Sequence, residues 1–277
     1  MKDNFGNRMK DYEQVSNLQL EKKIPVAIRL DGKAFHTFTR GFRKPFDDYL
    51  ISAMQKTMKY LCENIQGCVF GYTQSDEITL ILIDYQNENS DAWFDYRISK
   101  MCSVAASMAT LEFNRAFNEE IKNEIDSCQL NKYCKAIQKG AMFDARCFNI
   151  PQEEVANLIY WRQADAIRNS IQSVGQYYFS QKQLHKKSCE EIKEMLKTEK
   201  SIDWNTLPNT YKYGSCCIKR AKFLARKFKG LCNIEFTETV MRKKWEIDNN
   251  IPIFKGENRQ YIEKFIYKGY CVSMSKE

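Results

Sequence analysis

Two aspartates, Asp31 and Asp76, carry the side chains best suited to chemistry in this sequence. Carboxylates combine with nucleotide phosphates to bind Mg²⁺, and two such ions about 3.5–4 Å apart can activate an attacking hydroxyl together with the transferred phosphorus. Both aspartates also stand where turns are expected, Asp31 before Gly32 and Asp76 after Ser75. Spacing alone favours the turn role, so the metal hypothesis depends on whether the fold brings the two side chains together.

Residues 31–36 could also bind a triphosphate. Gly32 allows the backbone to approach a phosphate, and successive backbone N–H groups there could hold its oxygens. A triphosphate carries three or four negative charges, which several cations must offset. The candidates are Lys44, ahead of an expected helix, and Arg97 and Lys100, which lie three apart on one face of another helix. For each cation alone, a solvated helix surface is the favoured alternative.

Two further segments have the composition of RNA-binding surfaces. Arg162, Asp165 and Asn169 form one polar stripe on an expected helix, for which a solvated face or a local ion pair is the commoner explanation. Residues 219–229 interleave basic and aromatic side chains, which could bind phosphates and stack on bases. An amphipathic helix with its Phe side chains in the core explains this tract equally well. The RNA-binding candidates are Arg162, Asn169, Lys219, Arg220 and Lys222.

The composition excludes several classes of protein. Of the 277 residues 43% are apolar, which is enough for a sizeable core, and the excess of 43 Lys and Arg over 35 Asp and Glu favours an anionic partner such as nucleic acid. Two histidines, His36 and His185, are too few for a His-rich zinc site or a hydrolase triad. No apolar run approaches the about 18 residues of a membrane span. Eleven irregularly spaced cysteines without an export signal predict reduced thiols and a cytoplasmic protein.

Hydrophobic patterning predicts a ferredoxin-like (βαββαβ) order in the first half of the chain. Right-handed crossovers then place the strands side by side as 4-1-3-2. The end of the first strand and the turn between the second and third fall on one edge of that sheet, and neighbouring strands are about 5 Å apart. Asp31 and Asp76 should therefore reach one shared ion. Strands are expected at 24–31, 67–74, 77–84 and 143–150, and helices at 44–64 and about 91–117.

The second half of the chain is expected to be helical and mixed. A helix of about twenty residues follows Pro151, more helix is expected at 180–198, and strands are expected near 214–219 and 231–238. Residues 119–143 are polar and predict no regular element. The interpretation is an α+β fold, with a palm-like catalytic domain at 1–150 and a C-terminal part at 151–277 that packs on the palm and faces RNA.

Several motifs stand in register along the chain: RLDGKAFHTFTR, KPFDD, YTQSDE, WFDYRISKMCSVAAS, FDAR, YWRQADAIRN and LPNTYKYG. They resemble the tRNA(His) guanylyltransferase family over roughly residues 1–220. The resemblance implies a polymerase-like palm, a homotetramer built as a dimer of dimers, and nucleotide addition in the 3′ to 5′ direction. It also implies two Mg²⁺ ions, ATP and GTP or other nucleoside triphosphates as substrates, and tRNA as the partner.

The resemblance further implies roles for individual residues. Asp31 and Asp76 match metal-binding and catalytic aspartates, Gly32 would add a backbone carbonyl to the metal ligands, and Glu77 matches an acidic residue needed for activity. The expected nucleotide contacts are Asp31, Gly32, Lys33, Ala34, Phe35, His36, Lys44, Ser75, Asp76, Arg97 and Lys100.

One motif departs from the family. Eukaryotic members carry His-Ile-Asn-Asn after W-R-Q-x-D-x, a motif linked to the choice of tRNA(His), whereas in this chain residues 161–166 (WRQADA) are followed by Ile167-Arg168-Asn169-Ser170. The chain therefore looks more like the guanylyltransferase-like branch, which repairs 5′-truncated tRNAs with the opposite strand as template. We expect template-dependent 3′–5′ addition after ATP or GTP has activated the 5′ end.

Three alternatives stay open at this stage. The first is a tRNA(His)-specific guanylyltransferase that adds G at position −1, and the second is a nucleotide cyclase with the same palm. The third is a non-catalytic RNA-binding module, because RRM domains share the βαββαβ order. An RRM needs exposed aromatic residues on its third strand, and the segment ITLILID at 78–84 has none.

Overall fold

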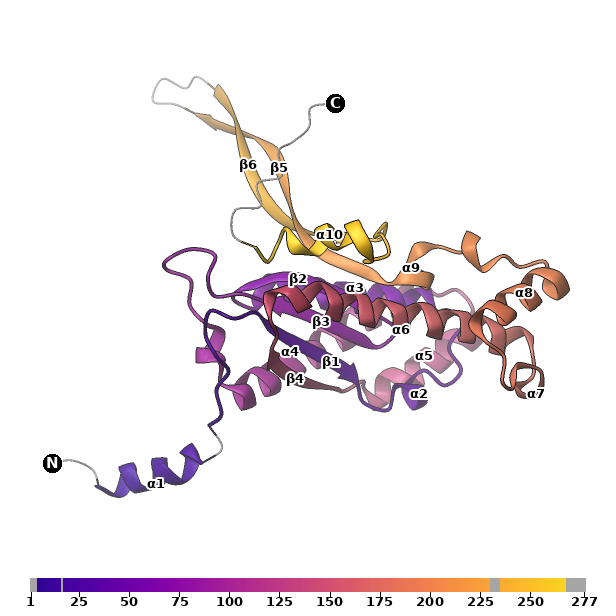
Figure 1. Cartoon of the computed structure of the whole chain (residues 1–277), viewed down its shortest axis with the longest axis horizontal. Helices are drawn as coiled ribbons and strands as arrows, with labels where there is room; N and C mark the ends of the chain where they lie inside the picture. The colour runs from indigo at the N-terminus through magenta and orange to yellow at the C-terminus, as the bar shows by residue number, and fades with distance from the viewer. Residues whose placement is uncertain (1–3, 16, 230–234, 268–277) are drawn as a thin grey trace.

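The centre of the molecule is a six-stranded antiparallel sheet in the order β4-β1-β3-β2-β5-β6 (Figure 1). The computed structural model describes residues 4–15, 17–229 and 235–267, without the side chains of 223–240. The order of the first four strands confirms the predicted palm-like α+β fold. The strands are β1 Val26–Gly32, β2 Cys68–Gln74, β3 Glu77–Leu82, β4 Phe143–Asn149, β5 Ser215–Lys229 and β6 Glu235–Asp248.

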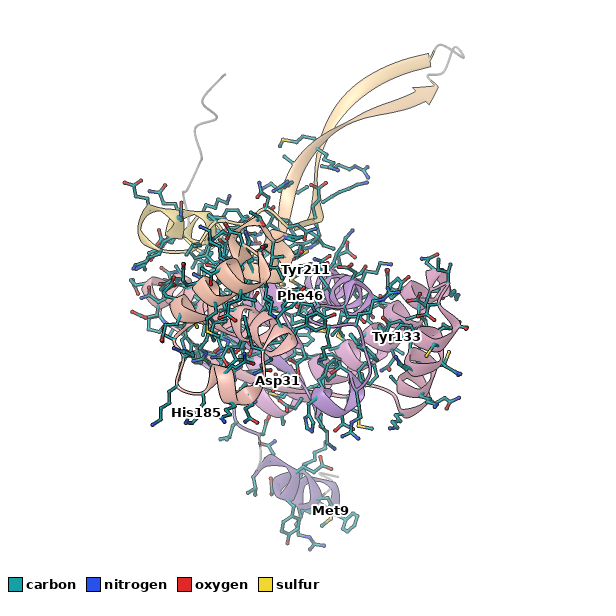
Figure 2. All side chains as sticks on the ribbon, turned by 90° about the vertical axis from the view of Figure 1, so that its right-hand side faces the viewer. Met9, Asp31, Phe46, Tyr133, His185 and Tyr211 are labelled. Carbon is teal, nitrogen blue, oxygen red and sulfur yellow. The ribbon has the colours of Figure 1, made fainter. Side chains whose placement is uncertain are left out.

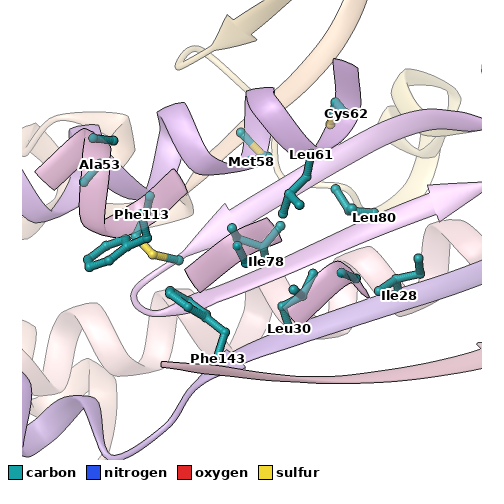
Figure 3. Close-up of a cluster of buried hydrophobic side chains, with 14 of the residues drawn as sticks. Ile28, Leu30, Ala53, Met58, Leu61, Cys62, Ile78, Leu80, Phe113 and Phe143 are labelled. Carbon is teal, nitrogen blue, oxygen red and sulfur yellow. The ribbon is translucent and has the colours of Figure 1, made fainter. Parts of the chain in front are cut away.

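Two long helices, α3 (Asp48–Asn64) and α4 (Ile98–Glu120), cover one face of this sheet. Helix α3 begins at Asp48 because the Asp47 side chain accepts a hydrogen bond from the Leu50 N–H. Its apolar stripe includes Met58 and Leu61, which are fully buried against the sheet (Figure 3). Burial of each such side chain stabilises the fold by about 1.5–3 kcal/mol.

Helix α6 (Gln152–Tyr178) crosses the other face of the sheet (Figure 1). Val155 and Ile159 are fully buried there, together with Ile81 of β3. Short elements of the C-terminal part, η4 (Gly256–Arg259) and α10 (Gln260–Glu263), follow β6, and Ile262 of α10 joins the same cluster. The sheet is thus buried on both faces, and polar side chains on it stand out as candidates for function.

Two expectations for the first half were wrong. The second helix does not begin near residue 91, because Phe94 and Asp95 have positive φ; a 3-10 turn η1 (Trp93–Tyr96) precedes α4 instead. Residues 119–143 are not irregular, since they form η2 (Ile121–Asn123) and α5 (Ser127–Lys139). The Asp126 side chain caps α5, and Tyr133 and Ala136 bury its narrow apolar stripe, which the polar outer face masked in the sequence.

The C-terminal part differs in detail from the expectation. The helical stretch expected at 180–198 is two helices, and the two strands are longer than predicted. Most of β5 and β6 forms a ribbon that projects from the body (Figure 1). The basic tract is therefore strand and not an amphipathic helix, and residues 231–234 of the second expected strand lie outside the described residues. The remaining elements are α7 Gln181–Leu184, α8 Cys189–Lys200, η3 Trp204–Thr206 and α9 Asn209–Tyr213.

The two predicted parts of the chain share one sheet. Thr73 of β2 pairs with Ser215 of β5, so the C-terminal part continues the sheet of the N-terminal part. The division at residue 150 stays a prediction. Two short helices, α1 (Asn4–Gln14) and α2 (Phe35–Phe38), complete the described elements. Among the described helices, none has the length and apolar content needed to cross a membrane.

Candidate active site

The two aspartates lie close together at one end of the neighbouring strands β1 and β3. Asp31 at the end of β1 pairs with Glu77, and the Gly32 N–H donates a hydrogen bond of 3.1 Å to the Asp76 carbonyl oxygen. Burial raises the pKa of the Asp76 carboxyl, and the nearby Asp31 charge raises it further, although a hydrogen bond from Ser75 Oγ acts the other way. The predicted convergence is confirmed, whereas the catalytic and metal-binding roles stay predictions.

A pocket of about 480 Å³ opens beside these aspartates, between α2, the start of α3, the β2–β3 turn and the middle of α6. This volume lies within the usual range of about 300–1,000 Å³ for small-molecule sites. Arg43 and Lys44 supply cations to its wall. Asp31 and Lys33 are not among its lining residues. The expected nucleotide contacts that do line it are Gly32, Ala34, Phe35, His36, Lys44, Ser75 and Asp76.

The floor of the pocket depends on Gly32. A Cβ at this position would lie 2.2 Å from the Phe35 ring, so only glycine lets the ring pack against the backbone. Ala34 has a φ of 54° and begins the single turn of α2. Phe35 is 4% exposed and packs against Phe113 and Phe143 in the core. Its ring therefore anchors the loop, while Gly32, Ala34 and His36 line the pocket.

Sequence reasoning missed the far wall of the pocket. Phe46 and Tyr211 stack there with ring centroids 4.4 Å apart, and Tyr211 hydroxyl donates a hydrogen bond to Asp48. Figure 2 labels Asp31, Phe46 and Tyr211 near the centre of this end of the molecule. The only sequence signal for Tyr211 was the motif LPNTYKYG, to which no role could be attached. Asn169 of α6 also lines the pocket, so it lies closer to the expected nucleotide than to an outer RNA surface.

A buried carboxylate holds the loop before α3. Asp47 is 4% exposed, and its carboxylate accepts hydrogen bonds from the backbone N–H groups of Arg43 and Leu50 and from Tyr133 hydroxyl at 2.6 Å. Tyr133 comes from α5, the helix that the sequence did not reveal. Burial and the Asp47 carboxylate raise the pKa of Tyr133 well above its ordinary value. This cluster fixes the backbone next to Lys44.

Replacing Tyr133 by phenylalanine is expected to lower the free energy of unfolding by about 1.5–3 kcal/mol, because a hydrogen bond to a charged acceptor is lost and Asp47 stays buried. Urea denaturation of the whole chain measures the change. Tyr12→Phe is the matched control, because Tyr12 is 69% exposed on α1. Equal unfolding midpoints for the Tyr133→Phe variant and the unaltered chain would show that Asp47 does not need this hydroxyl.

Glu77 and Arg162 lie where their expected roles do not suit them. Both side chains are nearly buried, and Arg162 Nε donates to Glu77 Oε1 at 2.6 Å while its Nη2 donates to Asp165 at 3.0 Å. Arg162 therefore does not form part of an exposed RNA-binding stripe, because α6 turns it onto the sheet. Glu77 is buried beside Asp31, its partner in the ladder, and its predicted role in activity stays a prediction.

Arg97 and Lys100 do not lie with the aspartates within this chain. Thr110 in the middle of α4 accepts a hydrogen bond from the Phe143 N–H, and Phe143 pairs with Gly32. At 1.5 Å per residue, Arg97 lies about 20 Å away along the helix axis. The reason is topological. Strand β3 runs away from Asp76, so α4, the long helix that follows it, begins near the opposite ends of the strands.

The three basic RNA candidates of β5 are exposed on the projecting ribbon. Lys219 stands 4.9 Å from the Trp245 ring, Arg220 pairs with Asp248, and Lys222 pairs with Glu246. These contacts with β6 orient the side chains but leave them at the surface. The structure thus places them away from the pocket, on a surface that a long ligand could reach.

The donors at the sheet edge suit Mg²⁺ better than a softer metal. Among the described residues, no group of three or more His, Cys, Asp and Glu could hold a metal ion by itself. Asp31 and Asp76 offer two carboxylates, and the repulsion that raises the pKa of Asp76 is what a divalent cation would offset. If the Gly32 carbonyl joins them as predicted, the ligands are all oxygen, which is the donor type that Mg²⁺ prefers.

Comparison with known proteins places this fold and pocket in context. The family model of tRNA(His) guanylyltransferase matches residues 6–151. A protein of Acanthamoeba polyphaga mimivirus is 30% identical over 76% of this chain and 75% of its own length. A probable tRNA(His) guanylyltransferase of Dictyostelium discoideum is 25% identical over 85% of this chain and 94% of its own length.

Solved structures agree with these matches. A bacterial tRNA(His) guanylyltransferase-like protein in complex with ATP is 38% identical, with a TM-score of 0.78 over 95% of this chain and 99% of that one. The Saccharomyces cerevisiae tRNA(His) guanylyltransferase shares the fold, with a TM-score of 0.62 and 21% identity over 78% of this chain and 92% of that one.

The palm-like sheet and its matches define a nucleotidyltransferase. The chain belongs to the tRNA(His) guanylyltransferase family, since the family model matches more than half of it and the viral relative is similar over three quarters.

Proposed function

We propose that this enzyme adds nucleotides in the 3′ to 5′ direction to the 5′ end of truncated tRNA, with the opposite strand as template. The observation that carries the proposal is the pair Asp31 and Asp76 at the edge of a palm-like sheet, beside a pocket with cations in its wall. Ile167 stands where eukaryotic relatives have histidine, which favours repair over strict choice of tRNA(His).

The reaction has two steps. The 5′-monophosphate of the RNA attacks the α-phosphorus of ATP or GTP and displaces pyrophosphate, which leaves a nucleotidyl cap on the 5′ end. The 3′-hydroxyl of an incoming nucleoside triphosphate then attacks the 5′ phosphorus and displaces the nucleoside monophosphate. ATP is supported as the activating nucleotide by the ATP complex of the bacterial relative, and GTP by the corresponding GTP complex at 35% identity.

The residues of the chain have distinct parts in this proposal. Arg43, Lys44 and the backbone N–H groups of 34–36 would offset the charge of the triphosphate in the pocket. Asp31, Asp76 and the Gly32 carbonyl would hold Mg²⁺. Such ions, when bound, lower the pKa of the attacking hydroxyl and stabilise the leaving phosphate.

The RNA and the oligomer extend beyond this one site. Lys219, Arg220 and Lys222 would bind the RNA backbone from the β5–β6 ribbon, where phosphate contacts add affinity without base choice. Arg97 and Lys100 lie too far along α4 to reach a triphosphate beside Asp76 of the same chain. Their expected role would require the pocket of a neighbouring protomer, as in the proposed homotetramer.

The direct test supplies Mg²⁺, labelled nucleoside triphosphates and a tRNA that lacks its first nucleotide. We expect incorporation of the nucleotide complementary to the template base, and a change of nucleotide when that base is changed. The matched comparison is tRNA(His) without its −1 residue. Addition of G to tRNA(His) alone, whatever the opposite base, would instead establish the tRNA(His)-specific activity, and a cyclic product without RNA would establish a cyclase.

A further inference from the structure

The α6 face of the sheet carries two ordered rows of charge near Asp31. Residues paired in an antiparallel ladder point to the same face. The pairings of β1 therefore align Asp144, Asp31 and Glu77 in one row across β4, β1 and β3. Two residues earlier on β1, about 6.6 Å away, Arg29 lies beside Arg146 of β4 in a second row. Carboxylates and guanidinium groups are thus segregated along the strand.

Trp161 of α6 lies over the second row. Its side chain stands 5.8 Å from the Arg29 guanidinium and 4.4 Å from that of Arg162, yet the residue is 54% exposed. The chain has four tryptophans, and the other three, Trp93, Trp204 and Trp245, are at most 9% exposed. An exposed indole supported by cations on a rigid helix suits the stacking of a base.

The two arginines of the second row retain capacity to bind an anion. Arg29 Nε is buried without a hydrogen-bond partner and lies 3.8 Å from Glu77, whose Oε1 Arg162 already engages. Arg146 is about half exposed, and its contact with Asp144 is long, at 3.4 Å. Neither guanidinium is satisfied as Arg162 is.

We propose that Trp161, Arg29 and Arg146 form a binding surface for the terminal nucleotide of the RNA 5′ end, with its base stacked on the indole and its phosphate at the guanidinium groups. This inference rests on the proposed function. Gly32 and Asp76 line the nucleotide pocket, and Arg29 belongs to the proposed RNA surface. Along β1, Asp31 stands between Arg29 and Gly32. Asp31 then lies between the nucleoside triphosphate and the RNA end, as a transfer between the two requires.

Nucleic acid suits this surface because it combines an aromatic face with an anionic phosphate. The ring offers π-stacking to any base, so the surface would bind the end without choosing its sequence, and the template strand would keep that choice. Arg146 would act through charge, so its contribution should weaken with salt.

Tryptophan fluorescence tests the proposal on the full chain, because acrylamide reaches Trp161 far better than the three buried indoles. A 5′-truncated acceptor-stem RNA is added, and its binding is followed separately by the anisotropy of a label on its 3′ end. We expect bound RNA to reduce the quenching of the unaltered chain to the level of the Trp161→Phe variant. The proposal would be overturned if RNA binds and the acrylamide quenching of Trp161 stays unchanged. It would also be overturned if, without RNA, Trp161 becomes protected from acrylamide as protein concentration rises, because the surface would then bind a second copy of the chain.

Affinity measurements separate this surface from the overall function. Trp161→Ala should weaken binding of the RNA about 10-fold, with partial recovery in Trp161→Phe, while ATP affinity stays unchanged. Arg146→Ala should reduce the slope of log affinity against log salt by about one. Tyr177→Ala is the matched control, because Tyr177 is also 54% exposed on α6. Full affinity in Trp161→Ala refutes this surface alone, whereas no binding of the RNA by the unaltered chain refutes the proposed function.

Discussion

Asp76→Asn should lower the rate of nucleotide addition by about a thousandfold. The substitution keeps the shape of the side chain but removes the charge that, with Asp31, would bind the cation. A bound cation contributes several kcal/mol to the transition state, and each 1.36 kcal/mol is a factor of ten in rate. Single-turnover addition to a capped RNA measures the chemical step without the activation step.

The control for this substitution is Asp95→Asn. Asp95 has an exposed carboxylate that pairs with Lys22, remote from the pocket, so the rate of the Asp95→Asn variant should stay within about twofold of the unaltered chain.

A second readout for Asp76→Asn is the stability of the metal-free chain. Because the raised pKa of Asp76 means that its ionised form costs free energy in the fold, Asp76→Asn should raise the melting temperature by about 1–3 °C at neutral pH. The gain should vanish in acid, below the pKa of an unfolded aspartate.

The same raised pKa sets the acid limb of activity. A cation binds the ionised carboxylate, so activity is full above the pKa of Asp76 and falls as pH drops through it. Since burial and Asp31 raise that pKa, the fall should begin at a higher pH than an ordinary aspartate would give. An unchanged rate in Asp76→Asn, with the acid limb intact, would remove this residue from the mechanism.

Arg162→Met should lower the free energy of unfolding by about 3 kcal/mol, because the buried Glu77 carboxylate loses its hydrogen-bonded partner and keeps only the longer contact with Arg29. Burial already raises the pKa of Glu77, and Arg162 acts against that rise. Without Arg162 the pKa of Glu77 rises further. The loss of stability should therefore be larger at neutral pH than in acid, where Glu77 is protonated in both variants.

A double variant isolates the pair. Arg162→Met combined with Glu77→Gln removes both charges, and it should recover most of the lost stability. Urea unfolding of the four chains completes the cycle. Additive losses in the double variant would show that the two side chains do not depend on each other, and that Glu77 does not act through Arg162.

The sequence predicted the palm because its strands and helices carry clear periodicity and because crossover handedness leaves few arrangements. Asp31 and Asp76 could be brought together from that topology alone. Helix α5 was missed because only one narrow stripe, around Tyr133, is apolar. The length of β5 and β6 was missed because most of this ribbon projects from the body, so packing on the sheet core does not set its sequence pattern.

The site was harder to predict than the fold, because it depends on contacts between distant segments. Nothing in the sequence pairs Glu77 with Arg162, 85 positions later, or stacks Phe46 on Tyr211. The roles that the resemblance implies for Arg97 and Lys100 stay predictions, since within one chain these residues lie near the start of α4, at the other end of the strands from Asp31 and Asp76. Trp161 belongs to the motif YWRQADAIRN, but nothing in the sequence assigned it a role, because only the packed structure reveals that its side chain is exposed on α6.

The central claim is that Asp31 and Asp76 together hold a divalent cation beneath a nucleoside triphosphate. Anomalous diffraction from crystals grown with Mn²⁺ and a non-hydrolysable ATP analogue measures this directly. We expect a manganese peak within coordination distance of both carboxylates and of the triphosphate in the pocket. If the ATP analogue is bound in the pocket but manganese lies elsewhere, or both carboxylates are free of metal, Asp31 and Asp76 do not hold the cation.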